Sequence, residues 1–390
     1  MDVERFRASP IGSLVRIQGE DRRTGVHYDH FAYLPEPLGA EPVLSNATWR
    51  AVSSASRALG RLQQGTRFIP NPALLRQPTL RREAQSTSAL EGTFAPLEQV
   101  LAADVIDASD RSLALTEILN FVEAAETGFG VLDIGGRVTT GLLCQLHGIL
   151  VRGTAAETGD AGRVREIQVA VGSRSGRVED ARYVPMPPGP LLAAGLQDLV
   201  DWITETAEGD PIVAAAMAHY QFESIHPFND GNGRIGRLLI VLQLLQDQVL
   251  SSSLLSVSPW FETRRDAYQD HLAAVGMTGD WDPWVRFFAE GIENSAVETA
   301  SRIERVLDVQ ESYQVRLRDA NIRGIARDIA QYVVGSPFVD IPALQRFTGK
   351  TYQAASDAVS KLVGIGILEE RDFGWRKVYR APEIVAAYSQ

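Results

Sequence analysis

Twelve consecutive residues, 226–237, carry side chains that can move a proton and hold an anion: His-Pro-Phe-Asn-Asp-Gly-Asn-Gly-Arg-Ile-Gly-Arg. His226 is a side chain that can accept a proton near neutral pH. Arg234 and Arg237 are three residues apart, so on a helix both reach from one face toward the same anion. Asp230 offers the hard carboxylate oxygens that Mg²⁺ prefers. The pattern predicts a site for a phosphorylated ligand.

Two apolar stretches of helical spacing flank these residues. The first begins with Pro211, which suits the first turn of a helix, and the second covers 238–245. Gly231 and Gly233 let the backbone come close to a ligand. The first turn of the second helix presents unpaired N–H groups and the positive end of its dipole. We therefore predict a loop between two core helices, with the anion at the start of the second helix.

The stretch resembles the signature of the Fic family, His-x-Phe-x-(Asp/Glu)-Gly-Asn-Gly-Arg-x-x-Arg, at every defining position. Most members move AMP from ATP to a hydroxyl of a protein side chain. The resemblance implies that His226 deprotonates the target Ser, Thr or Tyr and that Asp230 binds Mg²⁺ on the α- and β-phosphates. It also implies a buried Phe228 that anchors the loop.

The resemblance further assigns the nucleotide contacts. The residues that it places on the phosphates of ATP are Gly231, Asn232, Gly233, Arg234 and Arg237. Farther along, residues 259–268 are similar to the Fic segment that lines the adenine pocket, and Arg264 stands there where many relatives have Asn or His. Phosphoryl-type transfer needs positioning and charge neutralisation more than covalent chemistry, which agrees with this residue set.

Residues 87–92 end an expected helix and read Thr-Ser-Ala-Leu-Glu-Gly. A solvent-facing helix end with a glycine stop is one interpretation. The other comes from the resemblance, because many Fic proteins carry an inhibitory helix with the pattern (Ser/Thr)-x-x-x-Glu-(Gly/Asn). Thr87 and Glu91 match it, and the glutamate then pairs with Arg237 in the place of the γ-phosphate. This implies the subclass with an N-terminal inhibitory helix.

Residues 162–172 alternate apolar and polar side chains, and 181–185 can return as a second strand. The hairpin is either a structural hairpin at the edge of the fold or, as the resemblance implies, the Fic flap. A flap pairs with the backbone of the target protein and sets the modified side chain beside the histidine. Its expected docking residues are Ile167, Val169 and Val171.

The other segments predict a mainly α-helical fold. Residues 1–45 are polar and turn-rich, and prolines, among them Pro78, break the chain before the helix near 75–90. The resemblance implies a Fic helical bundle core with a β-hairpin flap. The expected domains are an N-terminal region at 1–110 with the inhibitory helix near 75–92, a catalytic core at 111–300, a connecting helix at 301–319 and a last domain at 320–390.

The last seventy residues predict a small winged helix-turn-helix domain. Three short helices near 325–334, 340–349 and 351–363 precede two strands at 367–371 and 377–380. Between 341 and 380, seven basic and four acidic residues give a net charge of +3, modestly favourable for DNA. The third helix carries little that reads base edges. Protein docking or homodimerisation fits the segment at least as well as DNA binding.

Composition narrows the class of protein. The net charge of −11 gives no global attraction to nucleic acid or membrane. The single cysteine, Cys144, lies in an apolar helical run and fits a reducing cytoplasm. No stretch of 18 apolar residues occurs, so we expect a soluble cytoplasmic protein with no membrane partner.

The leading hypothesis is an autoinhibited protein adenylyltransferase that uses ATP and Mg²⁺ and modifies a target protein and itself. One alternative is a DNA-binding regulator whose Fic core senses a nucleotide without catalysis; the intact His226 argues against it. Within the enzyme class, Gly233 argues against a Doc-like kinase, which has lysine there. Use of another nucleotide, and removal of AMP, remain alternatives.

Overall fold

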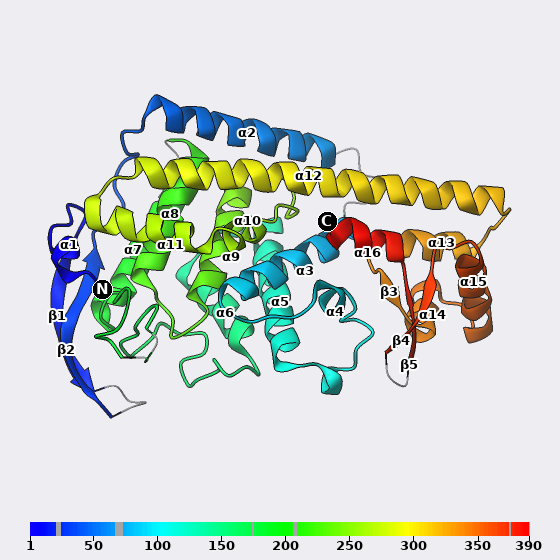
Figure 1. Cartoon of the computed structure of the whole chain (residues 1–390), viewed down its shortest axis with the longest axis horizontal. Helices are drawn as coiled ribbons and strands as arrows, with labels where there is room; N and C mark the ends of the chain where they lie inside the picture. The colour runs from blue at the N-terminus through cyan, green and yellow to red at the C-terminus, as the bar shows by residue number, and fades with distance from the viewer. Residues whose placement is uncertain are drawn as a thin grey trace.

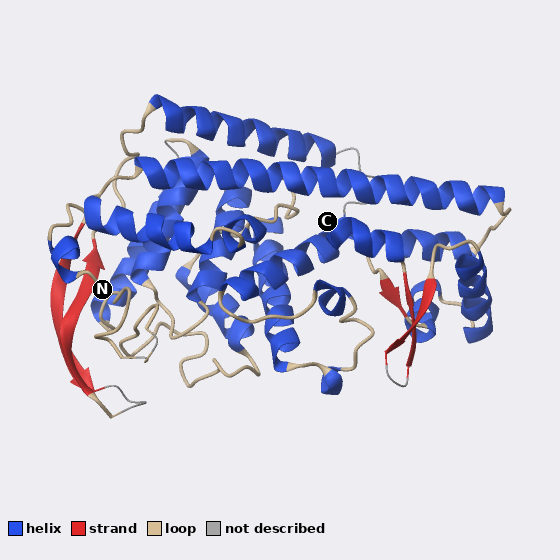
Figure 2. Cartoon of the chain, in the orientation of Figure 1, coloured by secondary structure: helices blue, strands red, loops and turns tan. Residues whose placement is uncertain are grey.

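A computed structural model describes residues 1–20, 25–66, 73–173, 175, 177–205, 209–373 and 376–389. Within these residues the chain forms sixteen α-helices, one 3₁₀ helix and five strands (Figures 1 and 2). The mainly helical fold predicted from the sequence is therefore confirmed. No helix of the described part is both long enough and apolar enough to cross a membrane.

Two long helices, α2 (Asn46–Thr66) and α12 (Asp282–Asp319), lie side by side along one edge of the molecule (Figure 1). The buried side chains of α2 recur at three- and four-residue intervals, as a one-sided helix requires. Asp282, in the first turn of α12, accepts hydrogen bonds from the backbone N–H and hydroxyl of Ser45 at 2.6 and 3.1 Å. These contacts fix the start of α2 against α12.

The core beneath this pair is a bundle of helices. Its members are α5 (Leu113–Asp133), α6 (Thr140–Val151), α7 (Pro190–Glu205), α8 (Pro211–Ile225) and α9 (Asn232–Gln246). Pro211 is the first residue of α8, and the side chain of Asp210 caps that helix. Helices α8 and α9 are buried on nearly all sides, which explains why their sequences are apolar over whole turns. They hold the loop of residues 226–231 between them.

Helix α3 (Ala73–Leu90) brings Thr87 and the following residues to this loop. Pro78 lies inside the helix, so the prediction that it breaks the chain there is wrong. A proline removes the N–H that would bond the carbonyl four residues earlier, here Leu74. Gly335 packs against that carbonyl, since a Cβ on Gly335 would lie 2.5 Å from it. The cost is limited because Pro78 lies only in the second turn. Pro70 and Pro72 lie outside the described residues.

The N-terminal region is not a simple irregular arm. Helix α1 (Val3–Arg7) precedes an antiparallel hairpin of β1 (Gly12–Glu20) and β2 (His27–Pro35), in which Gly12 faces Pro35. The hairpin was not predicted, because most of its side chains are at least partly exposed on both faces and show little apolar alternation. Tyr33 donates its backbone N–H to the carbonyl of Val184 at 2.9 Å, which joins β2 to the loop that follows residue 172.

The expected flap hairpin is largely irregular. Only one isolated antiparallel bridge, Val171 with Tyr183, replaces the strands predicted at 162–172 and 181–185. The carbonyls of Ile167 and Val169 accept hydrogen bonds from the side chains of Arg165 and Gln168 instead of a second strand. The apolar–polar alternation thus reflects a segment lying across the core surface, not a ladder.

Small elements connect these parts. They are α4 (Leu97–Leu101), η1 (Ala108–Asp110), α10 (Ser258–Glu262) and α11 (Arg265–Thr278). Helix α11 packs against α1 and α12, and α10 packs against α3. The element α10 therefore lies where the helix that carries Thr87 meets the long helix α12.

The C-terminal segment contains the three helices and two strands that were predicted: α13 (Ile325–Tyr332), α14 (Ile341–Thr348), α15 (Tyr352–Gly364), β4 (Glu369–Phe373) and β5 (Arg376–Arg380). A short strand, β3 (Phe338–Val339), and a last helix, α16 (Pro382–Ser389), were not predicted. The sheet order is β3-β5-β4, with antiparallel pairing. Helix α16 packs against α12, α3 and α4 (Figure 1). The C-terminal segment therefore contacts the core through this helix as well as through the chain connection from α12.

Candidate active site

The loop between α8 and α9 is held in shape by its own side chains. His226 ends α8 in the left-handed conformation, with φ 52°, and Gly231 precedes α9 with φ 76°. The Asn232 side chain accepts from the backbone N–H of Phe228 and donates to its carbonyl, both at 2.8 Å. Phe228 is fully buried, as predicted, and stacks on His147 at 4.1 Å between ring centroids. The Asn232 amide therefore closes the loop, and its two polar atoms are already bonded.

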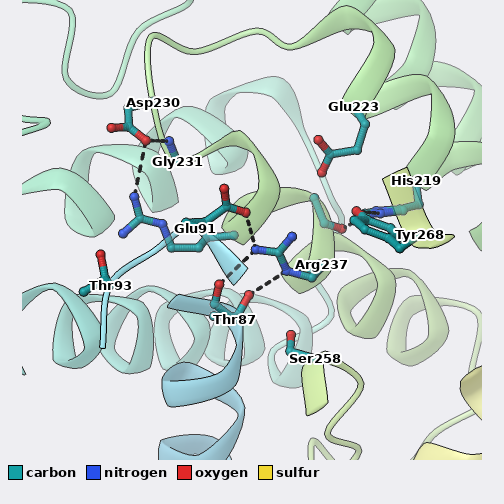
Figure 3. Close-up of polar contacts among 12 residues, drawn as sticks. Thr87, Glu91, Thr93, His219, Glu223, Asp230, Gly231, Arg237, Ser258 and Tyr268 are labelled. Carbon is teal, nitrogen blue, oxygen red and sulfur yellow. Dashed lines mark hydrogen bonds and ion pairs between the residues drawn. The ribbon is translucent and has the colours of Figure 1, made fainter. Parts of the chain in front are cut away.

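A cavity of about 250 Å³ opens beside this loop. Its wall includes Glu91, Glu223, His226, Gly233, Arg237 and Tyr268. Val171 and Gly172, from the segment predicted as the flap, line it as well. Residues from α8, α9 and α11 and Glu91, which directly follows α3, thus meet around one space, which is large enough for part of a nucleotide (Figure 3).

Arg237 is the buried arginine among the residues that line this cavity. Its guanidinium donates from Nε to the Thr87 hydroxyl at 2.7 Å and from Nη2 to the Thr87 carbonyl at 3.1 Å (Figure 3). Nη2 also pairs with Oε1 of Glu91 at 2.6 Å. Burial opposes the charge of Glu91, but the adjacent guanidinium outweighs it and lowers the pKa of this carboxyl. The predicted pair of Glu91 and Arg237 is present.

Gly233 gives Glu91 the room to reach Arg237. A Cβ at position 233 would lie 2.1 Å from Oε1 of Glu91 and 2.9 Å from Nη1 of Arg237. Any side chain there would therefore collide with the carboxylate. The carboxylate consequently lies against the first turn of α9, where unpaired N–H groups and the helix dipole favour an anion.

Arg234 lies in a different environment. It is buried and pairs with Glu117 of α5, which also accepts the Thr93 hydroxyl at 2.9 Å. Its Nη2 is 3.5 Å from Asp230, and Arg234 is not among the residues that line the cavity. The prediction that both arginines face one anion is therefore not met here, because each guanidinium has its own carboxylate partner.

His226 is placed to act as a base. Its side chain is 17% exposed, and Nδ1 lies 3.3 Å from the carbonyl of Glu223. Burial, reinforced by the charge of Arg165, lowers the pKa of His226 to about 4. The imidazole is therefore neutral at pH 7. A proton on Nδ1 toward the carbonyl leaves Nε2 free to accept one.

Arg165 is a residue that sequence reasoning missed. Its side chain is buried, and it donates to the carbonyls of His226 at 2.8 Å, Ile167 at 2.9 Å and Met186. Its backbone N–H donates to the carbonyl of Pro227 at 2.9 Å. One guanidinium thus joins the flap segment to the histidine. Nothing in its sequence neighbourhood distinguishes it from the exposed Arg163 two residues before it.

Glu223 is a second residue that was missed. It lies one turn before His226, near the end of α8, and its Oε2 is 4.0 Å from Nδ1 of that histidine. Its Oε1 is buried without a hydrogen-bond partner among the described residues. Burial and, to a smaller degree, the charge of Glu91 raise the pKa of Glu223 to about 7, although the charge of Arg237 lowers it. Its only sequence signal was an acid on a helix that is otherwise apolar.

Tyr268 lines the cavity, and the buried His219, which does not line it, holds the tyrosine in place. The two rings are joined by a hydrogen bond of 2.7 Å from the tyrosine hydroxyl to Nε2 of His219, whose Nδ1 lies 3.0 Å from the carbonyl of Gly236 (Figure 3). Burial lowers the pKa of His219 to about 3, so its Nδ1 proton belongs on the carbonyl side and Nε2 accepts. This bond orients Tyr268 in the cavity wall.

Asp230 is the acid that a magnesium ion would use. Its side chain is 59% exposed, and Oδ1 accepts the N–H of Gly231 at 2.5 Å. No cluster of three or more His, Cys, Asp or Glu side chains suited to a metal occurs among the described residues. Magnesium bound mainly through phosphate oxygens and water needs only one or two protein carboxylates. Asp230 fits that requirement.

The structure does not bring Arg264 to the cavity beside His226. Its guanidinium lies 3.4 Å above the ring of Trp260, and the residue lines a separate cavity, not the one beside His226. Arg264 falls between α10 and α11, so the chain turns its side chain away from the loop. Its neighbour Arg265 lines the first cavity instead.

Comparisons with known proteins agree with this arrangement. Residues 137–244 match the Fic/DOC family, and residues 49–130 match the Fic/DOC family N-terminal region. A curated relative, the protein adenylyltransferase fic-1 of Caenorhabditis elegans, is 38% identical over 143 residues, which is 36% of this chain and 25% of the relative. The protein adenylyltransferase Fic of Culex quinquefasciatus is 28% identical over 54% of this chain and 38% of the relative.

The chain thus spans well under half the length of the curated relatives that it matches. Among solved structures, a Fic family protein from Desulfovibrio desulfuricans G20 has a similar fold, with a TM-score of 0.55 and 22% identity over 88% of this chain and 98% of that one. The loop, the helices that hold it and these matches lead to one conclusion: residues 49–130 and 137–244 of this chain are Fic/DOC family regions.

Proposed function

We propose that this protein is an adenylyltransferase that transfers AMP from ATP to a Ser, Thr or Tyr hydroxyl of a protein and that Glu91 inhibits it. The observation that carries the proposal is the shared cavity, in which a neutral histidine, a helix N-terminus and Arg237 surround one space. The names of the curated relatives support the same reaction.

In the proposed reaction His226 takes the proton of the target hydroxyl on Nε2. The hydroxyl oxygen forms a bond to the α-phosphorus of ATP, the bond to the bridging oxygen of the β-phosphate breaks, and pyrophosphate leaves. Arg237 and the N–H groups of the first turn of α9 bind the phosphates. Asp230 would hold Mg²⁺ on the phosphate oxygens, and the metal would neutralise their charge.

Inhibition follows from competition for Arg237. The carboxylate of Glu91 takes a guanidinium N–H that a γ-phosphate oxygen would otherwise accept. Thr87 occupies the Nε donor of the same group. While both contacts persist, the γ-phosphate is displaced and the α-phosphate is out of line for attack. Release of the end of α3 would restore the site.

The target segment is proposed to dock beside the flap. Ile167, Val169 and Val171 are half-buried, and Val171 lines the cavity. Pairing through backbone atoms is largely independent of target sequence. The backbone fixed by Arg165 would then set the target hydroxyl beside His226.

The test is incubation of the purified chain with α-labelled ATP and Mg²⁺, followed by detection of label in protein. Glu91→Gly should incorporate label into itself, and Glu91→Gly combined with His226→Ala should not, although it still binds nucleotide. General-base catalysis typically contributes about 10²- to 10⁴-fold. Equal labelling by the two variants would remove His226 from its proposed role.

A further inference from the structure

A second cavity, of about 240 Å³, lies apart from the active site between α3, α10 and α12. Its wall is rich in cations and hydroxyls: Arg82, Arg264, Ser295, Glu298, Thr299 and Arg302. None of these six residues lines the cavity beside His226. Arg264, which sequence reasoning assigned to the adenine pocket, lies at this second site.

Arg302 is a buried cation whose hydrogen bonds are largely unmade. Its side chain is 3% exposed, and Nε and Nη1 have no hydrogen-bond partner among the described residues. The remaining nitrogen, Nη2, lies 3.8 Å from Glu298, whose side chain is 64% exposed. A buried donor left without an acceptor is costly, and more so when it is charged. The cavity is the place from which an acceptor can reach it.

Two buried hydroxyls on the same helix also lack hydrogen-bond partners among the described residues. Ser295 and Thr299 precede Arg302 by seven and three residues on α12, so all three lie on one face. The two residues are 5% and 1% exposed, and neither hydroxyl has a hydrogen-bond partner among the described residues. One face of α12 therefore presents a guanidinium and two hydroxyl donors to the same cavity.

The other walls add positive charge. Arg82 reaches the cavity from α3 with an unpartnered Nε, and Arg264 lies between α10 and α11, stacked on Trp260. Three arginines against one glutamate, Glu298, give the lining a net charge of +2. Burial, together with the smaller effect of the charge of Arg82, lowers the pKa of Arg302 to about 10. Glu298 therefore neutralises only one of the three positive charges in the cavity lining.

We propose that this cavity binds a phosphate-bearing small molecule. Three guanidinium groups from three elements can surround a single anion, and a phosphate group offers several oxygens and about two negative charges to them. The two α12 hydroxyls can donate to further phosphate oxygens. The inference stands independently of the proposed transfer reaction, because it uses none of the residues of that site.

The position of the site gives the ligand a structural effect. Arg82 lies on α3, nine residues before Glu91, and its neighbour Glu83 accepts from the Ser256 and Ser258 hydroxyls at 2.8 and 2.5 Å. An anion held by both Arg82 and Arg302 would join α3 to α12 across the cavity. The helix that carries the inhibitory carboxylate would be held at a second point along its length.

The test is titration calorimetry with inorganic phosphate at constant ionic strength, with chloride as the compensating anion. No nucleotide is added, because the carboxylate of Glu91 already occupies Arg237 in the wild type and a nucleotide would itself compete for the proposed site. We expect wild type to bind phosphate saturably with one site per chain. Arg302→Gln should weaken that binding at least about tenfold, since a hydrogen bond to a charged group is lost. Arg264→Met, which keeps an apolar chain over Trp260, should weaken it at least about threefold.

The matched control is Arg286→Met, an exposed arginine on α12 outside both cavities, which should bind phosphate as wild type does. Circular dichroism reports whether Arg302→Gln folds; if it does not, Arg264→Met decides the question alone. The inference is overturned if wild type shows no saturable binding beyond chloride. It is also overturned if the folded pocket variants bind phosphate as tightly as Arg286→Met.

Discussion

Nε of Arg165 donates a hydrogen bond to the backbone carbonyl of His226 across 2.8 Å, sixty-one residues along the chain. The histidine backbone is in the left-handed conformation that non-glycine residues seldom adopt, so it needs external support. The same guanidinium reaches the carbonyl of Ile167. Arg165 therefore sets the position of the base and of the flap segment together.

We expect Arg165→Met in the Glu91→Gly background to lower kcat for automodification about 10²-fold, because a misplaced reacting group costs about that much. The KM for ATP should change little, since Arg165 lies away from Arg237. Steady-state kinetics with labelled ATP separate the two constants. Arg163→Met, an exposed neighbour, is the control. An increase in KM without a change in kcat would place Arg165 on the nucleotide instead.

Glu91→Gly should raise automodification by about 10²-fold over wild type, since it frees Arg237 for the γ-phosphate and removes an anion from the phosphate site. Glu91→Gln keeps the length of the side chain without its charge and should give an intermediate rate. Incorporation of α-labelled ATP measures both. Rates equal to wild type in both variants would mean that the ion pair is structural only.

Glu223 should give the reaction a pH dependence that His226 alone cannot. His226, with a pKa of about 4, is neutral from pH 6 to 9, whereas Glu223, with a pKa of about 7, loses its proton within that range. The Glu223 carboxylate, 4.0 Å from Nδ1, stabilises the imidazolium formed during transfer. The rate of Glu91→Gly should therefore rise with pH, with a midpoint somewhat below 7, because the charge of Glu91 is absent.

The comparison is Glu91→Gly with and without Glu223→Gln, assayed for kcat from pH 5.5 to 9. The glutamine variant should lose the rise and be about tenfold slower at pH 8, equivalent to about 1.4 kcal/mol. Nucleotide affinity should be similar in both. Two superimposable profiles would show that Glu223 only packs the wall.

Asp230→Ala should remove most activity together with the saturable dependence on Mg²⁺, because Asp230 is the acid of the loop itself. Asp160 is the matched control, since its carboxylate accepts a hydrogen bond from the side chain of Asn229 in the same loop. Asp160→Asn should titrate with Mg²⁺ as the parent does. A normal titration in Asp230→Ala would place the metal elsewhere.

The parts of the site that could be predicted are those in which a short stretch fixes its own geometry. The loop at 226–231 could be predicted because the sequence shows the end of one helix, a glycine and the start of the next helix. The spacing of its polar residues then indicates the chemistry. The pair of Glu91 and Arg237, separated by 146 residues, came only from the family pattern. No periodicity in either segment points to the other.

The parts that could not be predicted depend on tertiary partners. Arg165 resembles its neighbouring arginines in sequence, and only folding brings it under His226. The flap segment alternates like a strand, yet the side chains of Arg165 and Gln168 occupy the carbonyls that a ladder would use. The β1–β2 hairpin stayed unrecognised because it buries little of either face.

Gly233 affects both the proposed inhibition by Glu91 and the proposed binding of the nucleotide. Natural selection therefore could not change one of these two properties at this position without changing the other. The missing side chain admits the carboxylate of Glu91 to the backbone that, in the proposed reaction, also binds the phosphates of ATP. A mutation that adds even a methyl group at 233 would therefore displace the carboxylate of Glu91 and obstruct the proposed substrate in one step. A substitution at position 233 would therefore remove the proposed inhibition without producing an overactive enzyme. A substitution of Glu91 would produce one, so the residue that follows α3 is the position at which related chains could come to differ in basal activity.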